Sequence, residues 1–188
     1  MTARLSVLRV ERFRAAGKAS EYSSRGYLSI LVMNNLIPGI RNAARAVIVR
    51  DDNILLLRKQ GGGQGERFAL PGGAQNLGET LAEALNRECQ EEIGTVVEIV
   101  RLLRIADYFK HRDTDPPSRR HLLEILFECT VPSGYTPISG YRPDKHQVEV
   151  VWMPVDNLPA ITLLPAALSA HLGASSGAAS AAYLGEIE

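Results

Sequence analysis

Apolar positions recur with two different periods between residues 44 and 155, and the change of period separates strands from a helix. Short runs of β-branched and other apolar residues predict strands at 44–51, 53–59, 96–109, 121–131 and 148–155. Between the first two runs stand Asp51, Asp52 and Asn53, which predict a tight hairpin turn.

A helical spacing occupies the middle of the chain. Apolar residues from Leu81 to Cys89 recur at every third or fourth position, which predicts a helix over about 79–93 that stops at Gly94. A second helix is expected over 162–172. Strands that bracket two helices indicate an α/β layered domain with a mixed sheet.

Two segments between these elements are expected to be loops. The glycine-rich stretch 60–67 predicts a flexible hairpin connection, because it lacks the Gly-Lys-Ser/Thr ending of a nucleotide-binding P-loop. The stretch 110–121 is polar and contains prolines, so it predicts a surface loop.

The composition is that of one folded domain, with 45% hydrophobic and 22% charged residues among 188. The 21 basic and 21 acidic residues cancel, so neither nucleic acid nor an anionic membrane is an expected partner. Because no apolar run reaches about 18 residues, no membrane span is expected either. Cys89 and Cys129 form no CxxC motif, which favours two buried free thiols and a cytoplasmic location.

The domain is expected to cover residues 41–188. Residues 1–40 are interpreted as an N-terminal extension, in which 1–32 are dispensable because Met33 stands just before the first expected strand. An Ala/Ser/Gly-rich connection at 173–182 then leads to a last apolar piece.

Acidic residues are concentrated at the end of the predicted central helix. At 100° per residue, Glu88, Glu91 and Glu92 fall within an arc of about 100° on the side that continues the apolar face. Like charges one turn apart repel unless a cation lies between them, and carboxylates are ligands suited to Mg²⁺ or Mn²⁺. The alternative is a solvated acidic helix face without a metal.

The segment GGAQNLGETLAEALNRECQEEIGT at 72–95 resembles the signature of the Nudix hydrolases. The fixed positions of that signature are met by Gly73, Glu79, Arg87, Glu88, Glu91, Glu92 and Gly94. FALPGG at 68–73 and VEVVWMPVDNL at 148–158 are similar to flanking parts of the family. Cys89 and Thr95 depart from the usual aliphatic residues, which affects packing more than chemistry.

The resemblance implies that 41–188 is a Nudix hydrolase domain, an α/β/α sandwich with a mixed sheet and a metal-binding helix after a Gly-Gly loop. It also implies divalent-metal-dependent hydrolysis of a pyrophosphate bond in a nucleoside diphosphate linked to another moiety. A catalytically weak, nucleotide-binding regulatory module of the same family is the alternative.

Site residues follow from the same resemblance. Glu88, Glu91 and Glu92 are the expected ligands of Mg²⁺ or Mn²⁺, with the carbonyl of Gly72 as a further ligand. Glu79 is expected to orient the junction of loop and helix, while Arg87 is expected to pair with Glu91 and Glu83 and so to fix the carboxylates. The general base stays open among these later residues: Glu124, Asp144 and Glu149.

The expected substrate is a nucleotide-derived small molecule, with ADP-ribose or a nucleotide sugar favoured over a nucleoside triphosphate. The candidates for substrate contacts are Arg58, Arg67, Arg119, Arg120 and Phe109. A homodimer is left open as the state of assembly.

Overall fold

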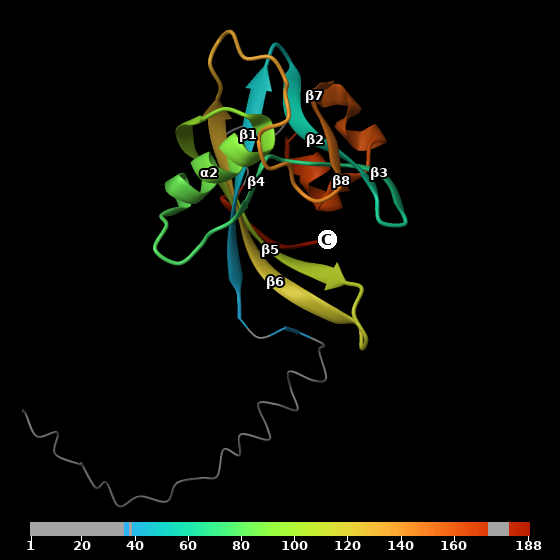
Figure 1. Cartoon of the computed structure of the whole chain (residues 1–188). Coiled ribbons are helices and arrows are strands. Elements are labelled where there is room, and N and C mark those ends of the chain that lie inside the picture. The colour runs from blue at the N-terminus through green and yellow to red at the C-terminus, as the bar shows by residue number, and fades with distance from the viewer. Residues whose placement is uncertain (1–35, 38, 173–180) are drawn as a thin grey trace, which may run out of the picture.

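The computed structural model describes residues 36–37, 39–172 and 181–188 (Figure 1). The strands are β1 (Arg41–Arg50), β2 (Asn53–Gly61), β3 (Gln64–Ala69), β4 (Gly72–Ala74), β5 (Glu98–Arg112), β6 (Ser118–Thr130), β7 (Gln147–Pro154), β8 (Leu163–Leu164) and β9 (Tyr183–Ile187). The helices are α2 (Leu81–Ile93), the 3-10 helices η1 (Val155–Ala160) and η2 (Ala166–Leu168), and α3 (Ser169–Leu172).

The strands form one strongly curved mixed sheet in the order β8-β3-β2-β1-β6-β5-β9, with β4 paired to β1 and β7 paired to β2. β1 runs parallel to β6, β3 to β8 and β5 to β9, while the other pairs are antiparallel. Figure 1 shows α2 on one side of β1 and the short C-terminal helices beside β2, β3 and β8. The expected mixed-sheet α/β/α sandwich is therefore confirmed.

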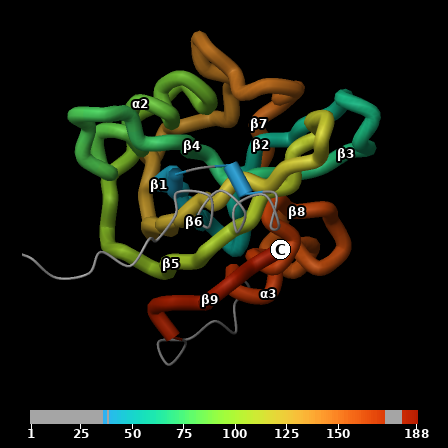
Figure 2. Tube along the Cα trace, turned by 90° about the horizontal axis from the view of Figure 1, so that it is seen from below, coloured from blue at the N-terminus to red at the C-terminus, as the bar shows by residue number. Residues whose placement is uncertain are grey.

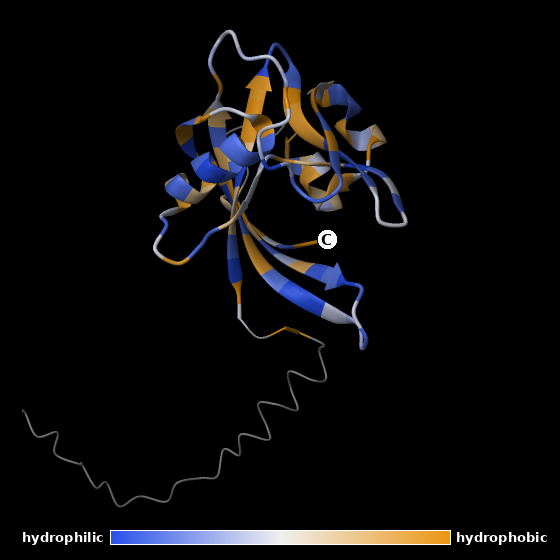
Figure 3. Cartoon of the chain, in the orientation of Figure 1, coloured by the Kyte–Doolittle hydropathy of each residue, from blue (hydrophilic) through white to orange (hydrophobic). Residues whose placement is uncertain are grey.

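β1 is the centre of the core because both of its faces are covered. Ala44, Ala46 and Ile48 pack on the side of α2. Val47 belongs to the second cluster, which includes Leu158 from η1. Figure 3 shows the apolar colour on the upper part of β1, whereas the far ends of β5 and β6 are mostly hydrophilic. A strand buried on both faces reads as a continuous apolar run, as β1 does from Ala46 to Ile48.

Local capping signals fix the ends of α2. Thr80 accepts a hydrogen bond from the backbone N–H of Glu83, whose carboxylate accepts one from the backbone N–H of Thr80. This reciprocal capping box satisfies two free donors of the first turn. At the other end Gly94 adopts a left-handed conformation with φ of 69°. The helix thus begins two residues later than expected.

Three expectations about the connections are wrong. The stretch 60–67 does form a hairpin connection, but most of it is strand rather than loop, because β2 continues to Gly61 and β3 begins at Gln64. The stretch 110–121 is also mostly strand, since β5 and β6 pair regularly as far as Arg112 and Ser118. The helix expected over 162–172 is instead β8 followed by η2 and α3, because the backbone of Thr162 to Leu164 pairs with β3.

Residues near both ends of the described chain pair with the β5–β6 hairpin. Leu36 bridges to Arg119, and β9 adds a parallel edge strand to β5, as seen from below in Figure 2. The expectation for residues 1–32 and most of the 173–182 connection lie outside the described residues.

Among the helices that the structure describes, none has the length and apolar character needed to cross a membrane. Cys89 and Cys129 are buried free thiols, as predicted.

Candidate active site

The three glutamates of the acidic cluster lie in different environments on α2. The side chain of Glu92 is buried, with 3% of its surface exposed, and accepts a 2.8 Å hydrogen bond from the backbone N–H of Gly72. Burial raises the pKa of Glu92 to about 8, although the hydrogen bond from Gly72 and the nearby charge of Arg45 oppose that rise. A carboxyl group buried without an ion-pair partner is stabilised in its charged form by a bound cation.

Arginines hold the other two carboxylates. Glu88 accepts a 2.7 Å hydrogen bond from Arg87, while Glu91 lies 3.6 Å from Arg87 and 3.6 Å from Arg142. Among the residues that the structure describes, no three acidic, imidazole or thiol groups are already placed to share one metal ion. The donor set is nevertheless all oxygen, and the expected Arg87–Glu91 pair at i,i+4 is present.

Arg87 fastens the helix to the preceding loop. Its guanidinium donates hydrogen bonds of 2.7 and 3.1 Å to the two carboxylate oxygens of Glu79 and one of 3.0 Å to the carbonyl of Ala74. Glu79 also accepts from the backbone N–H of Asn76, so it orients the loop–helix junction as expected. The expected pair between Arg87 and Glu83 is wrong, because the carboxylate of Glu83 caps the helix.

The Gly-Gly loop lies so close to its neighbours that side chains are excluded. A Cβ on Gly73 would lie 2.5 Å from the carboxyl carbon of Glu88. A Cβ on Gly72 would lie 2.2 Å from the carbonyl oxygen of Ala44, and Gly72 has a φ of 121°. The carbonyl of Gly72, expected as a metal ligand, accepts a hydrogen bond from Arg45. Close backbone approach therefore requires both glycines.

Two adjoining pockets surround the acidic cluster. One, of about 300 Å³, is lined by Gly72, Glu88, Glu92 and Asp144 together with basic residues of β1, β5 and β6. The other, of about 360 Å³, is lined by all three glutamates and by Asp144. A third pocket of about 300 Å³ also has Asp144 in its wall. Asp144 thus lies where the three pockets meet.

The general-base candidates are not equivalent in the structure. Asp144 pairs with Lys59, and although burial acts to raise its pKa, the bond to Lys59 holds that pKa below the usual value. Glu124 is 1% exposed and accepts a 2.8 Å hydrogen bond from Arg45. Glu149 lines none of the three pockets, since its carboxylate pairs with Arg58 on the neighbouring strand.

The five candidates for substrate contacts also differ in which pockets they line. Arg120 lines the pocket that contains Gly72, whereas Phe109 and Arg119 line the third pocket. Side chains alternate along β6, so Arg120 shares the face of Glu124 while Arg119 lies on the opposite face. On that face Arg119 lies over the ring of Phe109, with 5.5 Å between guanidinium carbon and ring centroid.

The remaining two candidates have structural partners away from the glutamates. The guanidinium of Arg58 pairs with Glu66 and Glu149. Arg67 donates hydrogen bonds to the carbonyls of Gly61, Gln64 and Gly65, and so closes the β2–β3 turn.

Sequence reasoning missed several cations that the structure brings to the site. They are Arg41, Arg45, Lys110 and Arg112, all lining the pocket with Glu88 and Glu92. Their even spacing on β1 and β5 was visible, but the parallel pairing of β1 with β6 that assembles them was not. The loop before β7 was missed as well: the N–H groups of Gly140 and Arg142 bind the carbonyls of Glu92 and Glu91 at 3.0 and 2.9 Å.

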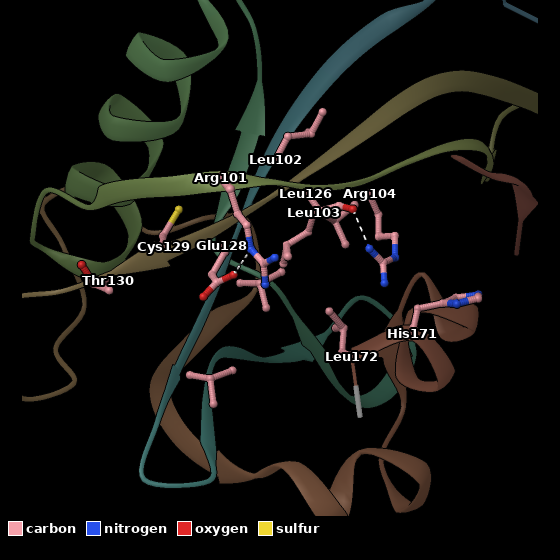
Figure 4. A pocket seen from close by; sticks show the side chains of 12 residues that line it. Arg101, Leu102, Leu103, Arg104, Leu126, Glu128, Cys129, Thr130, His171 and Leu172 are labelled. Atoms are coloured by element: carbon pink, nitrogen blue, oxygen red, sulfur yellow. Dashed lines mark hydrogen bonds and ion pairs between the residues drawn. The ribbon is translucent and has the colours of Figure 1, made fainter. Parts of the chain in front are cut away.

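Another pocket, of about 390 Å³, lies apart from this site (Figure 4). Leucines from β5, β6 and α3 line it together with Arg101, Arg104 and His171. Its one carboxylate, that of Glu128, is 2.6 Å from Arg101. This pocket has no cluster of acidic groups and is not part of the candidate active site.

Comparisons with known proteins identify two curated relatives. The chain is 36% identical over 119 residues to the ADP-ribose pyrophosphatase of Methanocaldococcus jannaschii, covering 63% of this chain and 64% of that protein. It is 34% identical over 90 residues to the Bacillus subtilis protein YjhB, covering 48% and 41%. The chain therefore spans less than two thirds of the length of either relative.

A solved structure and a family model extend the comparison. The structure of a NUDIX hydrolase from Nitrosomonas europaea superposes with a TM-score of 0.51 and 25% identity, covering 65% of this chain and 78% of that one. The model of the NUDIX domain matches residues 40–171, which include strands β1 to β8, α2 and all three glutamates. The chain belongs to the NUDIX domain family.

Proposed function

We propose that this protein hydrolyses the pyrophosphate bond of a nucleoside diphosphate linked to another moiety, with Mg²⁺ or Mn²⁺ held by Glu88, Glu91 and Glu92. One observation carries the proposal: these carboxylates adjoin a pocket whose wall also contains Arg45 and Lys110. Hydrolysis of a diphosphate needs alignment and charge neutralisation more than covalent chemistry by the protein, and this pocket offers both signs of charge.

The chain's own residues have separate parts in this mechanism. A bound divalent cation supplies neutralisation of the phosphates and activation of water. Arg87 and Glu79 hold the loop against α2 and so set the position of Glu88. Lys110 supplies positive charge for phosphate oxygens, while the Arg45–Glu124 pair keeps the backbone of Gly72 in place.

We propose Asp144 as the proton acceptor for the attacking water. Among the three candidates it alone lines both pockets that contain Glu88 and Glu92. Its depressed pKa keeps the carboxylate charged and able to accept a proton. Glu124 lines only the third pocket, and Glu149 lines none of the three.

ADP-ribose or another nucleotide sugar is the proposed substrate, a choice supported by the relative from Methanocaldococcus jannaschii. The intact set of carboxylates favours an enzyme over a binding module. The test is a panel of ADP-ribose, a nucleotide sugar and a nucleoside triphosphate with Mg²⁺ or Mn²⁺, measured by release of nucleoside monophosphate, orthophosphate or pyrophosphate. Metal-dependent formation of AMP and ribose 5-phosphate from ADP-ribose is expected. Tight binding of ADP-ribose without turnover would instead support the regulatory module.

A further inference from the structure

The β5–β6 hairpin projects from the body of the molecule in Figure 1. Two arginines lie near its end, Arg112 and Arg120, and Arg41 at the start of β1 lines the same pocket. Arg120 on β6 pairs with Lys110 on β5, and Arg112 is its diagonal neighbour on the same strand as Lys110. Arg41 on β1 is level with Leu122, two residues from Arg120. By strand spacing the three Cα atoms of Arg41, Arg112 and Arg120 lie about 8 Å from one neighbour to the next, on one face of the sheet.

The charges of these arginines are not balanced by acidic side chains within the described part of the chain. None of Arg41, Arg112 and Arg120 has an ion pair there, although other arginines of the same strands do, such as Arg101 with Glu128. Burial lowers the pKa of Arg120, and the positive charges of Arg112 and Arg41 lower it further. Three cations that repel one another, all lining one pocket, form a site that an anion would stabilise.

Lys110 lies between the three arginines and the acidic end of that pocket. It pairs with Arg120 across the hairpin, while the charges of Arg45, Lys59, Asp144 and Glu124 act on its pKa. The charges that act on the pKa of Arg120, after burial, are those of Arg112 and Arg41. Along β6, Arg120 and Glu124 are four residues apart, or about 13 Å between Cα atoms. The pocket therefore has an acidic end and a basic end.

We propose that Arg41, Arg112 and Arg120 form a subsite for an additional phosphate group of the substrate, beyond the diphosphate that is cleaved. This inference rests on the proposed function, because it uses the cleaved diphosphate to fix the substrate at the acidic end. Guanidinium groups suit phosphate because their paired N–H donors match its oxygens. The additional phosphate is either on a ribose hydroxyl or at the end of a longer phosphate chain.

The test compares substrates that differ by one phosphate. ADP-ribose is compared with ADP-ribose 2′-phosphate, and ADP with ATP, using the wild type, Arg120→Gln and Arg41→Gln. Arg101→Gln is the matched control, since Arg101 is an exposed arginine at the other end of β5. The wild type should favour the phosphorylated member of one pair by about tenfold in kcat/KM. Arg120→Gln and Arg41→Gln should reduce this preference to about twofold or less, whereas Arg101→Gln should keep it.

A titration with inorganic phosphate, followed by NMR, gives a readout that does not depend on turnover. Phosphate should shift the resonances of Arg112 and Arg120 in the wild type and Arg101→Gln, and it should bind about tenfold more weakly to Arg120→Gln. Cleavage of ADP-ribose without any preference for an additional phosphate would overturn the subsite, as would equal phosphate binding by wild type and Arg120→Gln. Failure to cleave any substrate would instead overturn the proposed function, and the phosphate titration would then decide on the subsite.

Discussion

The backbone N–H of Gly140 donates a 3.0 Å hydrogen bond to the carbonyl oxygen of Glu92, in the last turn of α2. The side chain of Gln147 donates a second bond, of 2.8 Å, to the same oxygen. The last carbonyls of a helix have no partner within the helix, and here the loop before β7 provides one. Because the same loop carries Asp144, it ties the proposed proton acceptor to the proposed metal ligands.

Substitution of Gly140 should therefore weaken catalysis more than folding. A Cβ at this position would lie 2.4 Å from the carbonyl oxygens of both Gln90 and Glu91, so Gly140→Ala must move the loop away from the helix. We expect kcat to fall by about tenfold or more, with a smaller change in KM. Gly134→Ala is the control in the same loop, since a Cβ there meets nothing within 4 Å. Equal kinetics for the two variants would contradict the positioning role.

The pKa of Glu92 predicts a pH dependence for the metal-free protein. The carboxyl group keeps its proton up to about pH 8 in the folded state, against about 4.5 when exposed. Between these values the folded protein binds one more proton than the unfolded chain, so the free energy of unfolding should fall as pH rises, by up to about 1.4 kcal/mol per pH unit. Glu92→Gln should lack this contribution and be more stable than the wild type at pH 8. Chemical denaturation at pH 5, 6.5 and 8 measures the difference, and an identical pH slope in both proteins would contradict the assignment.

Gly73 should tolerate no side chain without loss of metal affinity. A Cβ there would contact both carboxylate oxygens of Glu88, at 2.6 and 2.7 Å, so Gly73→Ala should displace that carboxylate. Calorimetric titration with Mn²⁺ should show affinity lower by about tenfold. Gly65→Ala is a control in the β2–β3 hairpin, where a Cβ meets nothing within 4 Å. Unchanged Mn²⁺ affinity in Gly73→Ala would remove Glu88 from the metal site.

The sequence predicted the parts of the site that depend on local spacing. The helical repeat from Leu81 to Cys89 places the glutamates on one face, and the capping signals at Thr80 and Gly94 are local as well. The helix expected over 162–172 was wrong because pairing of Leu163 with Phe68 in β3 overrides local helical propensity.

Contacts between segments that are far apart in the sequence could not be predicted from local spacing. Polar side chains at 110–121 suggested a loop, but the strands of this hairpin leave much of both faces exposed at its end, so apolar alternation is absent. Arg45 meets Glu124 only because β1 runs parallel to β6. Arg58 and Arg67 were expected near substrate, and only the tertiary structure shows their partners in the β2–β3–β7 region.

The central claim is that the acidic cluster holds a divalent cation against a diphosphate. The most direct measurement compares Mg²⁺-dependent hydrolysis of ADP-ribose by Glu91→Gln and Glu83→Gln. Both substitutions remove one carboxylate from α2, but Glu83 belongs to the capping box, where glutamine is also suitable. We expect turnover to fall by about 100-fold or more in Glu91→Gln and to stay within about twofold of wild type in Glu83→Gln. Equal, wild-type-like turnover of the two variants would contradict the metal assignment.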